Sequence, residues 1–194
     1  MREFILKRNT AESEVLVDFG LDQYETPEII TPIKFFNHML DLFAFHGCFK
    51  IIVEAHSNDN DPHHIIEDIA INMGMCFKTA LGDKKGINRY GWASVPMDEA
   101  LVLSSVDISG RPHCSFDINF KYQSINDLPV EMIQHFFESF ATNACCTIHI
   151  KQLNGTNDHH IAEAIFKSFA QSLSMACSLT NKYQNLIPSS KGAL

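Results

Sequence analysis

The sequence predicts an α+β fold in which a unit of one β-sheet and two helices occurs twice. Three observations support this: a motif that repeats at half the chain length, helical patterns around both copies, and strand-like runs between them. The chain has 194 residues, 45% of them hydrophobic and 20% charged, enough for an ordinary globular core. We expect one integrated domain made of a first half-repeat (1–88), a second half-repeat (89–180) and a C-terminal tail (181–194).

A histidine-rich motif repeats at half the chain length. Each half contains one upstream histidine in the pattern His-x-x-acid-x-Phe-Ala, followed by the pattern His-His-x-x-Glu. The doublets are 96 residues apart and the upstream histidines 97, so one period spans half of the 194 residues. The repeated residues are His38, His63, His64 and Glu67 in the first half, and His135, His159, His160 and Glu163 in the second.

The upstream histidines fall in predicted amphipathic helices. In the first half, Thr31 and Pro32 are typical of a helix start and Gly47 of a helix end, and apolar residues recur between them at helical spacing. The corresponding helix of the second half is expected to begin near Pro129. Each of these helices would bury one apolar face in the core.

The doublets lie in the first turn of two further predicted helices. Asp61 and Pro62 indicate the start of one, which would end before Gly82, and Asp158 is the expected N-cap of the other. Strand-like runs lie between the helices, and residues 84–92 are expected to join the two halves. The predicted strands are residues 15–19, 49–54, 101–108, 114–120 and 147–151.

The doublets predict two metal sites. Residues four apart share a helix face, so His63 and Glu67 can bind one ion, whereas the adjacent His64 must point elsewhere. Imidazole and carboxylate ligands without cysteine suit a divalent ion such as manganese, iron or zinc. The sequence leaves open whether the halves meet within a chain or between subunits. Applying the repeat, we predict the ligand sets His38, His64, His159, Glu163 and His135, His160, His63, Glu67.

Composition excludes several other classes of protein. The formal net charge is -8, and no segment carries the dense Lys and Arg cluster that a nucleic-acid surface needs. No apolar run approaches the roughly 20 residues that span a bilayer, and residues 1–10 lack the apolar core of a signal peptide. We therefore expect a cytoplasmic protein that binds neither nucleic acid nor membrane, with its six cysteines as reduced thiols.

Further motifs are spread along the full length. They are residues Arg8 to Glu12, Phe35 to Leu40, Arg89 to Gly91, Pro96 to Leu101, Asp107 to Pro112, Gly155 to Lys167 and Pro188 to Gly192. Together with the doublets, they resemble the imidazoleglycerol-phosphate dehydratase family of histidine biosynthesis. The resemblance implies a duplicated fold like the second domain of ribosomal protein S5. It also implies two Mn²⁺ ions per active site and a cage-like homo-oligomer of about 24 subunits with active sites between subunits.

The resemblance further implies a reaction and its residues. The reaction is the dehydration of imidazole-glycerol phosphate to imidazole-acetol phosphate, in which two ions on the substrate imidazole would help the ring expel the neighbouring hydroxyl. Glu12 is the candidate acid/base, and Glu67 and Glu163 are the other expected catalytic residues. The expected substrate-binding residues, chiefly for the phosphate, are Glu12, Arg89, Arg111, Lys167, Ser189, Ser190 and Lys191.

Two other interpretations stay open at this point. A catalytically silent, oligomeric metal-binding paralogue would keep the ligands, but a purely structural metal site would not need an anion-binding group of arginine, lysine and serine residues. A dinuclear metallohydrolase usually relies on aspartates and bridging carboxylates, whereas the ligands predicted here are mostly imidazoles. Turnover of imidazole-glycerol phosphate, compared with that of generic phosphate esters, distinguishes the three.

The chain departs from the family pattern at three places. Asn37 stands beside His38 where the family usually has aspartate, and Ser13 replaces the common threonine after Glu12. The loop of residues 56–62 lacks the usual Gly-Asp step and is one residue short. None of these changes removes a predicted ligand, but Asn37 and the loop put the positioning of adjacent ligands in question.

Overall fold

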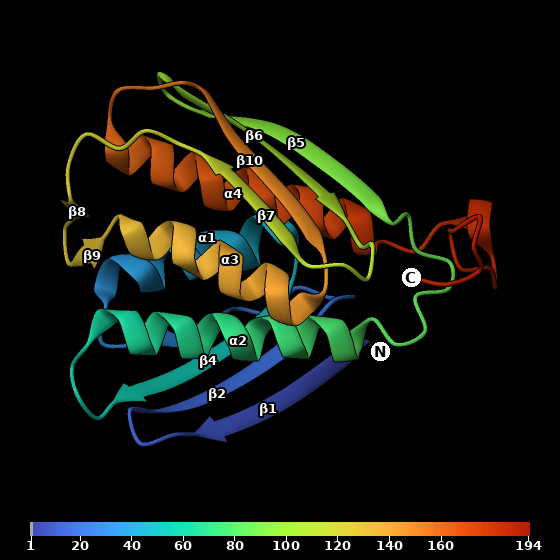
Figure 1. Ribbon diagram of the computed structural model, residues 1–194, viewed down its shortest axis with the longest axis horizontal. Helices are drawn as coiled ribbons and strands as arrows, with labels where there is room; N and C mark the ends of the chain where they lie inside the picture. Colours follow the sequence, from blue (N-terminus) through green and yellow to red (C-terminus); the bar gives the residue numbers. More distant parts are fainter. Residues whose placement is uncertain (1) are drawn as a thin grey trace.

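In the computed structural model, which describes residues 2–194, four helices lie between two four-stranded sheets (Figure 1). Helix α2 packs on the first sheet and α4 on the second, while α1 pairs with α4 and α3 with α2. Each helix pair therefore joins the first half of the chain to the second. The helices are α1 (Lys34–Gly47), α2 (Pro62–Ala80), α3 (Glu131–Ala144) and α4 (Asp158–Cys177).

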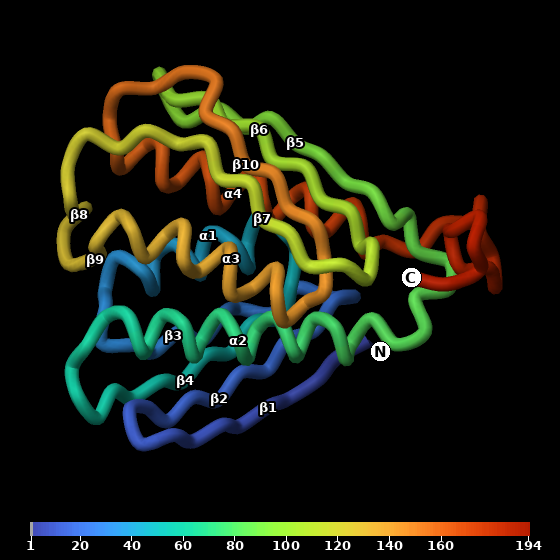
Figure 2. The backbone as a smooth tube through the Cα atoms, viewed as in Figure 1, coloured from blue at the N-terminus to red at the C-terminus, as the bar shows by residue number. Residues whose placement is uncertain are grey.

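The two sheets have the same topology, as the backbone trace in Figure 2 shows. In each sheet three strands are antiparallel neighbours, and a short fourth strand runs parallel to the third. The first sheet has the order β1 (Glu3–Asn9), β2 (Ser13–Gly20), β4 (Lys50–Ser57), β3 (Glu28–Ile30). The second has the order β5 (Tyr90–Met97), β6 (Ala100–Asp107), β10 (Thr147–Asn154), β7 (His113–Asp117). The remaining elements are β8 (Ser124–Ile125), β9 (Leu128–Pro129) and the 3-10 helix η1 (Asn181–Tyr183).

The repeat extends to the backbone at the helix ends. Helices α1 and α3 both end in a left-handed residue, Cys48 (φ 54°) and Cys145 (φ 52°), which stand at equivalent positions of the two halves. Gly47 is the last residue of α1, and a Cβ there would lie 2.3 Å from the ring of Phe49. The predicted duplicated α+β fold is confirmed.

Phenylalanine rings fill the space between the sheets. Phe43 of α1 and Phe140 of α3 occupy equivalent positions, and both are fully buried. Their ring centroids lie 5.6 and 5.4 Å from that of Phe169 in α4, so one ring of α4 contacts both halves. Close packing of this kind fixes the helices, and with them the histidines near their N-terminal ends.

The starts of two helices differ from the prediction. Helix α1 begins at Lys34, two residues after Pro32, because the residue before it is extended and the N–H groups of the first two helical residues donate to Asp127 in the other half. The N-cap of α4 is Asn157, not Asp158. The carboxylate of Asp158 instead accepts backbone N–H groups from residues 121 and 122.

The start predicted for the first doublet helix is confirmed, because Asp61 caps α2 and accepts the N–H of His63. The strand predictions are confirmed in outline, with two corrections. Strand β7 ends at Asp117, so the predicted continuation to residue 120 is wrong, and β5 begins at Tyr90, inside the predicted join of residues 84–92. Strands β1, β3 and β5 were not predicted, since their outer faces mix polar and apolar residues and give no clean alternation.

Candidate functional site

The first cluster of candidate ligands lies between helices α1 and α4. His38 comes from α1, and His159 and Glu163 lie one turn apart at the start of α4. The Nε2 atoms of His38 and His159 are 3.4 and 3.0 Å from Glu163 Oε1, and the three candidate ligand atoms lie within 4.8 Å of one another. Two imidazoles and one carboxylate form a donor set that suits a divalent transition ion.

Lys167 contacts the carboxylate of this cluster from the next turn of α4. Its Nζ atom is 2.6 Å from Glu163 Oε2, and only 10% of the Glu163 side chain is exposed. Burial raises the pKa of Glu163, but the hydrogen bonds from Lys167 and His38 outweigh it and lower the pKa to about 2. Glu163 is therefore ionised at neutral pH.

The second cluster lies between helices α2 and α3 and has the same composition. The Nε2 atoms of His135 and His63 are 3.6 and 3.9 Å from the two carboxylate oxygens of Glu67, and the two ring centroids are 4.5 Å apart. His135 Nε2 is buried and has no hydrogen-bond partner among the described residues. A buried imidazole nitrogen without a partner is costly, and a metal ion is a ligand that would satisfy it.

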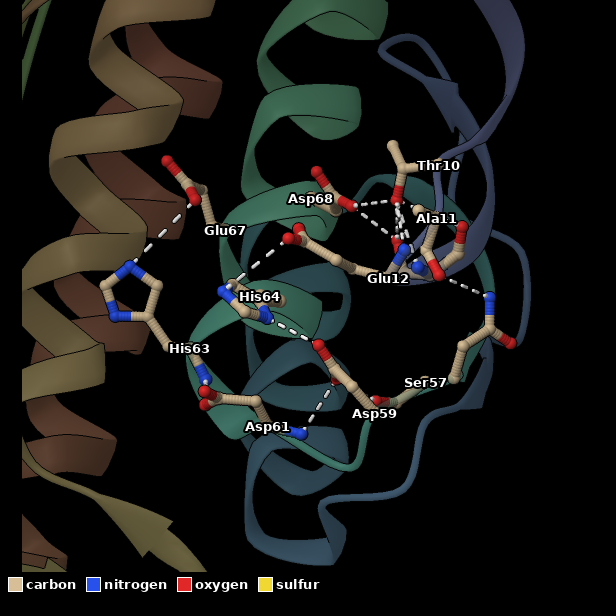
Figure 3. A network of polar contacts seen from close by, with 12 residues as sticks. Thr10, Ala11, Glu12, Ser57, Asp59, Asp61, His63, His64, Glu67 and Asp68 are labelled. Atoms are coloured by element: carbon tan, nitrogen blue, oxygen red, sulfur yellow. Dashed lines mark hydrogen bonds and ion pairs between the residues drawn. The ribbon is translucent and has the colours of Figure 1, made fainter.

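The second histidine of each doublet points away from these clusters. Figure 3 shows His63 directed toward α3, and His64 on the other side of α2 between Glu12 and Asp59. His64 Nδ1 is 2.6 Å from Asp59 Oδ2, and its Nε2 is 3.9 Å from Glu12 Oε1. The backbone N–H of Asp61 and the contact with His64 lower the pKa of Asp59 to about 2, and the same contact raises the pKa of His64.

His160 has an equivalent environment in the second half. Its Nδ1 is 2.7 Å from Glu99 Oε2, and its Nε2 is 3.8 Å from Asp98 Oδ2, both in the hairpin between β5 and β6. The hydrogen bond from His160 and the backbone N–H of Asn157 lower the pKa of Glu99 to about 2, and the pKa of His160 is raised by the same bond. Within one chain, three of the four predicted ligands of each set thus lie together, and the fourth faces outward.

Glu12, the candidate acid/base, is held beside α2 by a polar network. The buried carboxylate of Asp68 accepts hydrogen bonds from the hydroxyls of Thr10 and Ser13, and it forms an ion pair with Arg8. Thr10 Oγ1 in turn accepts the N–H of Glu12 at 3.1 Å. Ser13 therefore supplies one of the two hydroxyls on which the network depends.

The remaining candidate substrate residues lie beside the C-terminal tail, and Figure 1 shows the C-terminus at the end of the molecule opposite the N-terminal ends of α2 and α4. Arg89 pairs with Asp107 at 2.8 and 3.2 Å and donates to the carbonyl oxygen of Pro188 at 3.0 Å. Gly110 packs against the backbone of Leu194, so residue 111 is also beside the tail. The residues at this end are Arg89, Arg111, Ser189, Ser190 and Lys191.

Two of the departures from the family pattern have a direct structural outcome. The side chain of Asn37 hydrogen-bonds with Thr31: its Oδ1 accepts the Thr31 hydroxyl at 2.6 Å, and its Nδ2 donates to the Thr31 carbonyl oxygen at 3.3 Å. The short loop of residues 56–62 carries Asp59, which contacts His64. Sequence reasoning missed Asp59 and Glu99 as histidine partners. The only feature of the sequence that points to Asp59 is its place as an acidic residue in the loop just before the first doublet.

A cavity of about 490 Å³ opens beside the first cluster and gives it access from solvent. A second cavity, of about 400 Å³, also borders His159 and is lined in part by the loop before α4. Both are bounded by the β8–β9 turn. The residues lining the first cavity are Lys34, Phe35, His38, Asn126, Asp127 and His159.

Comparison with known proteins agrees with this geometry. The family model described as imidazoleglycerol-phosphate dehydratase matches residues 31–173. The chain belongs to the imidazoleglycerol-phosphate dehydratase family. A Caldicellulosiruptor bescii protein of that name is 44% identical over 190 residues, covering 97% of this chain and 96% of its own length. A Lactococcus lactis subsp. cremoris protein of that name is 45% identical over 199 residues, covering 100% of this chain and 98% of its own.

Solved structures of the family have the same fold. The Staphylococcus aureus imidazoleglycerol-phosphate dehydratase aligns with a TM-score of 0.84 at 35% identity, over 92% of this chain and 99% of its own. The Pyrococcus furiosus enzyme, in complex with (S)-C348, aligns with a TM-score of 0.84 at 35% identity, over 97% of this chain and 100% of its own.

Family membership defines the reaction. The chain is a hydro-lyase of histidine biosynthesis that dehydrates imidazole-glycerol phosphate, and its substrate therefore carries a phosphate. The two clusters are candidate metal-binding groups, which is consistent with metal use. Across residues 2–194, none of the helices has both the length and the apolar character that crossing a bilayer requires.

Proposed function

We propose that the dehydration uses two divalent ions, Mn²⁺ in the cell, each held by three histidines and one glutamate. The observation that carries this proposal is the buried Nε2 of His135, which lies beside Glu67 and His63 without a hydrogen-bond partner among the described residues. The equivalent position in the first half, His38, faces Glu163 and His159 in the same way. Nitrogen and oxygen donors without sulfur fit Mn²⁺.

Each ligand set would be completed by the outward histidine of another copy of the chain. His64 would join His38, His159 and Glu163, and His160 would join His63, Glu67 and His135. The side chains of His64 and His160 are 34% and 25% exposed, so a neighbouring copy can reach them. A closed cage of about 24 subunits is the assembly we propose, because two outward ligands per chain require repeated contacts between copies.

The phosphate would bind to the cationic end of a neighbouring copy. The cationic and hydroxyl groups beside the C-terminal tail lie far from the clusters of their own chain, so they can serve only a site in another copy. These groups belong to Arg89, Arg111, Ser189, Ser190 and Lys191. Arginine presents a planar fork that matches phosphate oxygens, and serine hydroxyls donate to the remaining ones. Lys167 is the cation nearest the first cluster and would approach the phosphate or a hydroxyl of the substrate.

The proton transfers would fall to Glu12. Bound divalent ions supply Lewis acidity to the imidazole nitrogens of the substrate. Glu12 Oε1 stands 3.9 Å from His64 Nε2, so its carboxylate would lie beside an ion bound to that nitrogen. Its carboxylate would accept the proton from the carbon next to the one that loses the hydroxyl. Glu12 would pass that proton to the departing hydroxyl, which leaves as water, and the resulting enol would tautomerise to the ketone of imidazole-acetol phosphate.

Metal removal and replacement test the proposal. Protein stripped with a chelator should lose dehydration of imidazole-glycerol phosphate and regain it with Mn²⁺, at about two ions per chain. His64→Ala should lose metal and activity together, whereas His56→Ala, which alters an exposed histidine on the outer face of β4, should keep both. Full turnover by metal-free protein, or a His64→Ala variant with normal metal content, would refute the ligand assignment.

Mixed assemblies test whether sites are shared between copies. His38→Ala and His64→Ala each remove one ligand of the same proposed set, so either variant alone should be inactive. If the ligands come from different copies, dissociating, mixing and reassembling the two variants should restore part of the activity, because some sites then receive His38 and His64 intact. Sites built within one chain would give no recovery, since every chain in the mixture lacks one ligand.

A further inference from the structure

Two carboxylates that belong to neither cluster contact the outward histidines in the same way. Asp59 Oδ2 lies 2.6 Å from His64 Nδ1, and Glu99 Oε2 lies 2.7 Å from His160 Nδ1. An ionised carboxylate can only accept, so in both pairs the imidazole Nδ1 must carry the proton. The lone pair of the neutral ring then resides on Nε2, the same nitrogen that the four clustered histidines direct at their glutamates.

The second oxygen of each carboxylate is fixed by the backbone. Asp59 Oδ1 accepts the N–H of Asp61 at 3.0 Å and the hydroxyl of Ser57 at 3.1 Å. Glu99 Oε1 accepts N–H groups of residues 156 and 157, at 3.2 and 2.8 Å, just before α4. Each carboxylate thus joins an imidazole to the backbone near the start of its doublet helix, and neither ring can turn without breaking a charged hydrogen bond.

The two carboxylates occupy different places in the repeat. Glu99 immediately precedes β6 in the β5–β6 hairpin, whereas Asp59 lies in the loop between β4 and α2 (Figure 3). The residue that immediately precedes β2 in the equivalent hairpin is Glu12, which faces the Nε2 side of His64 instead. The carboxylate contact to histidine Nδ1 is therefore made from non-equivalent positions in the two halves. In the first half it is made by Asp59, and the hairpin glutamate, Glu12, faces Nε2 instead.

We infer that Asp59 and Glu99 are positioning residues, which fix the tautomer and direction of His64 and His160 so that Nε2 is presented to a divalent ion held by a neighbouring copy. This inference rests on the proposed function, because His64 and His160 act as ligands only in that scheme. The inference has a second consequence, for Glu12. Because Asp59 binds Nδ1 of His64, Glu12 remains available for proton transfer, whereas its counterpart in the second hairpin, Glu99, orients His160.

The test compares Mn²⁺ affinity across matched variants of the assembled protein, stripped of metal and titrated in competition with a chelator. Asp59→Ala and Glu99→Ala should raise the dissociation constant for Mn²⁺ by about 10- to 100-fold, and excess Mn²⁺ should restore turnover. Asp59→Asn, which keeps an acceptor for the backbone of the loop, should give a smaller loss. Glu54→Ala removes the partner of an exposed histidine, His56, on the outer sheet face and should change neither quantity.

A double-mutant cycle separates positioning from general destabilisation. On the His64→Ala background, Asp59→Ala should cause no further loss of Mn²⁺ affinity, because the ring that it orients is gone. Unchanged affinity in Asp59→Ala, or an equal loss with and without His64, would overturn the inference while leaving the ligand assignment intact. Normal affinity in His64→Ala alone would overturn the ligand assignment itself. If Asp59→Ala melts early, Asp59→Asn decides the matter.

Discussion

The two candidate metal-binding clusters contain the same residue types in different surroundings. The Glu163 side chain of the first cluster is 10% exposed and contacts Lys167, whereas that of Glu67 in the second is 38% exposed. The residue one turn after Glu67, equivalent to Lys167, is Ile71. Helix periodicity dictates the spacing between histidine and glutamate, so both halves retain it, but nothing in that periodicity fixes the charge of the next turn.

This difference in charge predicts a division of labour between the clusters. With neutral histidines, the first cluster and Lys167 carry no net charge, whereas the second carries the single negative charge of Glu67. A divalent ion is therefore attracted more strongly to the second cluster. In the first cluster, an ion bound to Glu163 would compete with Lys167 and would leave its ammonium group free to meet an anionic substrate.

The largest expected effects concern stability, in which the two halves should be equal. Phe43→Ala and Phe140→Ala each remove a fully buried ring that packs on Phe169, and each should lower the free energy of unfolding by about 3–5 kcal/mol. Urea unfolding of metal-free protein at one fixed concentration measures this. Phe45→Ala, at a ring that is 59% exposed, should cost far less. A large loss in only one of the buried variants would show that the halves contribute unequally to the core.

The next effects concern catalysis, in which both clusters should be indispensable. Glu67→Gln and Glu163→Gln keep the side-chain shape but remove the charge of a proposed ligand. Each should lower kcat/KM by more than about 100-fold, which exceeds the loss of about 10- to 100-fold expected when a residue that only hydrogen-bonds to a ligand is changed. Steady-state kinetics and metal content at fixed Mn²⁺ check this, with Glu138→Gln on the exposed side of α3 as the control. Activity retained in Glu67→Gln would confine the chemistry to the first cluster.

The parts of this arrangement that sequence could predict are those set by local periodicity. The offset of the two motifs predicts the duplication, and the spacing of His63 and Glu67 places them on one face of α2. The cap at Asp61 follows from the residue types next to the helix. The resemblance of the motifs to one family then supplied the reaction, which no pattern of helices and strands implies.

The parts that sequence could not predict depend on residues distant in the chain. Asp127 caps α1 although it stands 93 residues from Lys34, so the local signal at Thr31 placed the start of this helix too early. Glu99 reaches His160 across 61 residues of sequence. Such contacts exist only once the sheets and helices have packed, and single-sequence patterns carry no information about them.

A tenfold effect is expected from changing the cation that distinguishes the clusters. Lys167→Met should raise the KM for imidazole-glycerol phosphate about tenfold, the loss of about 1.4 kcal/mol expected for a charged contact. The same variant should bind Mn²⁺ more tightly at the first cluster, because Glu163 loses its competing partner. Kinetics and metal titration measure the two effects separately.

The converse variant, Ile71→Lys, places an ammonium group one turn after Glu67 and should weaken Mn²⁺ binding at the second cluster. Together the two substitutions exchange the surroundings of the clusters while leaving all proposed ligands in place. If neither changes metal affinity, the charge difference between the clusters has no part in binding, and the first cluster keeps its lysine for the substrate alone.

The smallest expected effect tests the cap that only one of the equivalent helices possesses. Asp127 accepts the first two N–H groups of α1 at 2.7 and 2.9 Å, whereas α3 begins without a side-chain cap. Asp127→Ala should therefore lower the free energy of unfolding by about 1 kcal/mol and speed hydrogen exchange in the first turn of α1, but not in that of α3. Because His38 lies in the second turn of α1, Mn²⁺ affinity should fall at the first cluster only. An equal loss at both clusters would mean that Asp127 acts through the packing of the halves and not through the helix that it caps.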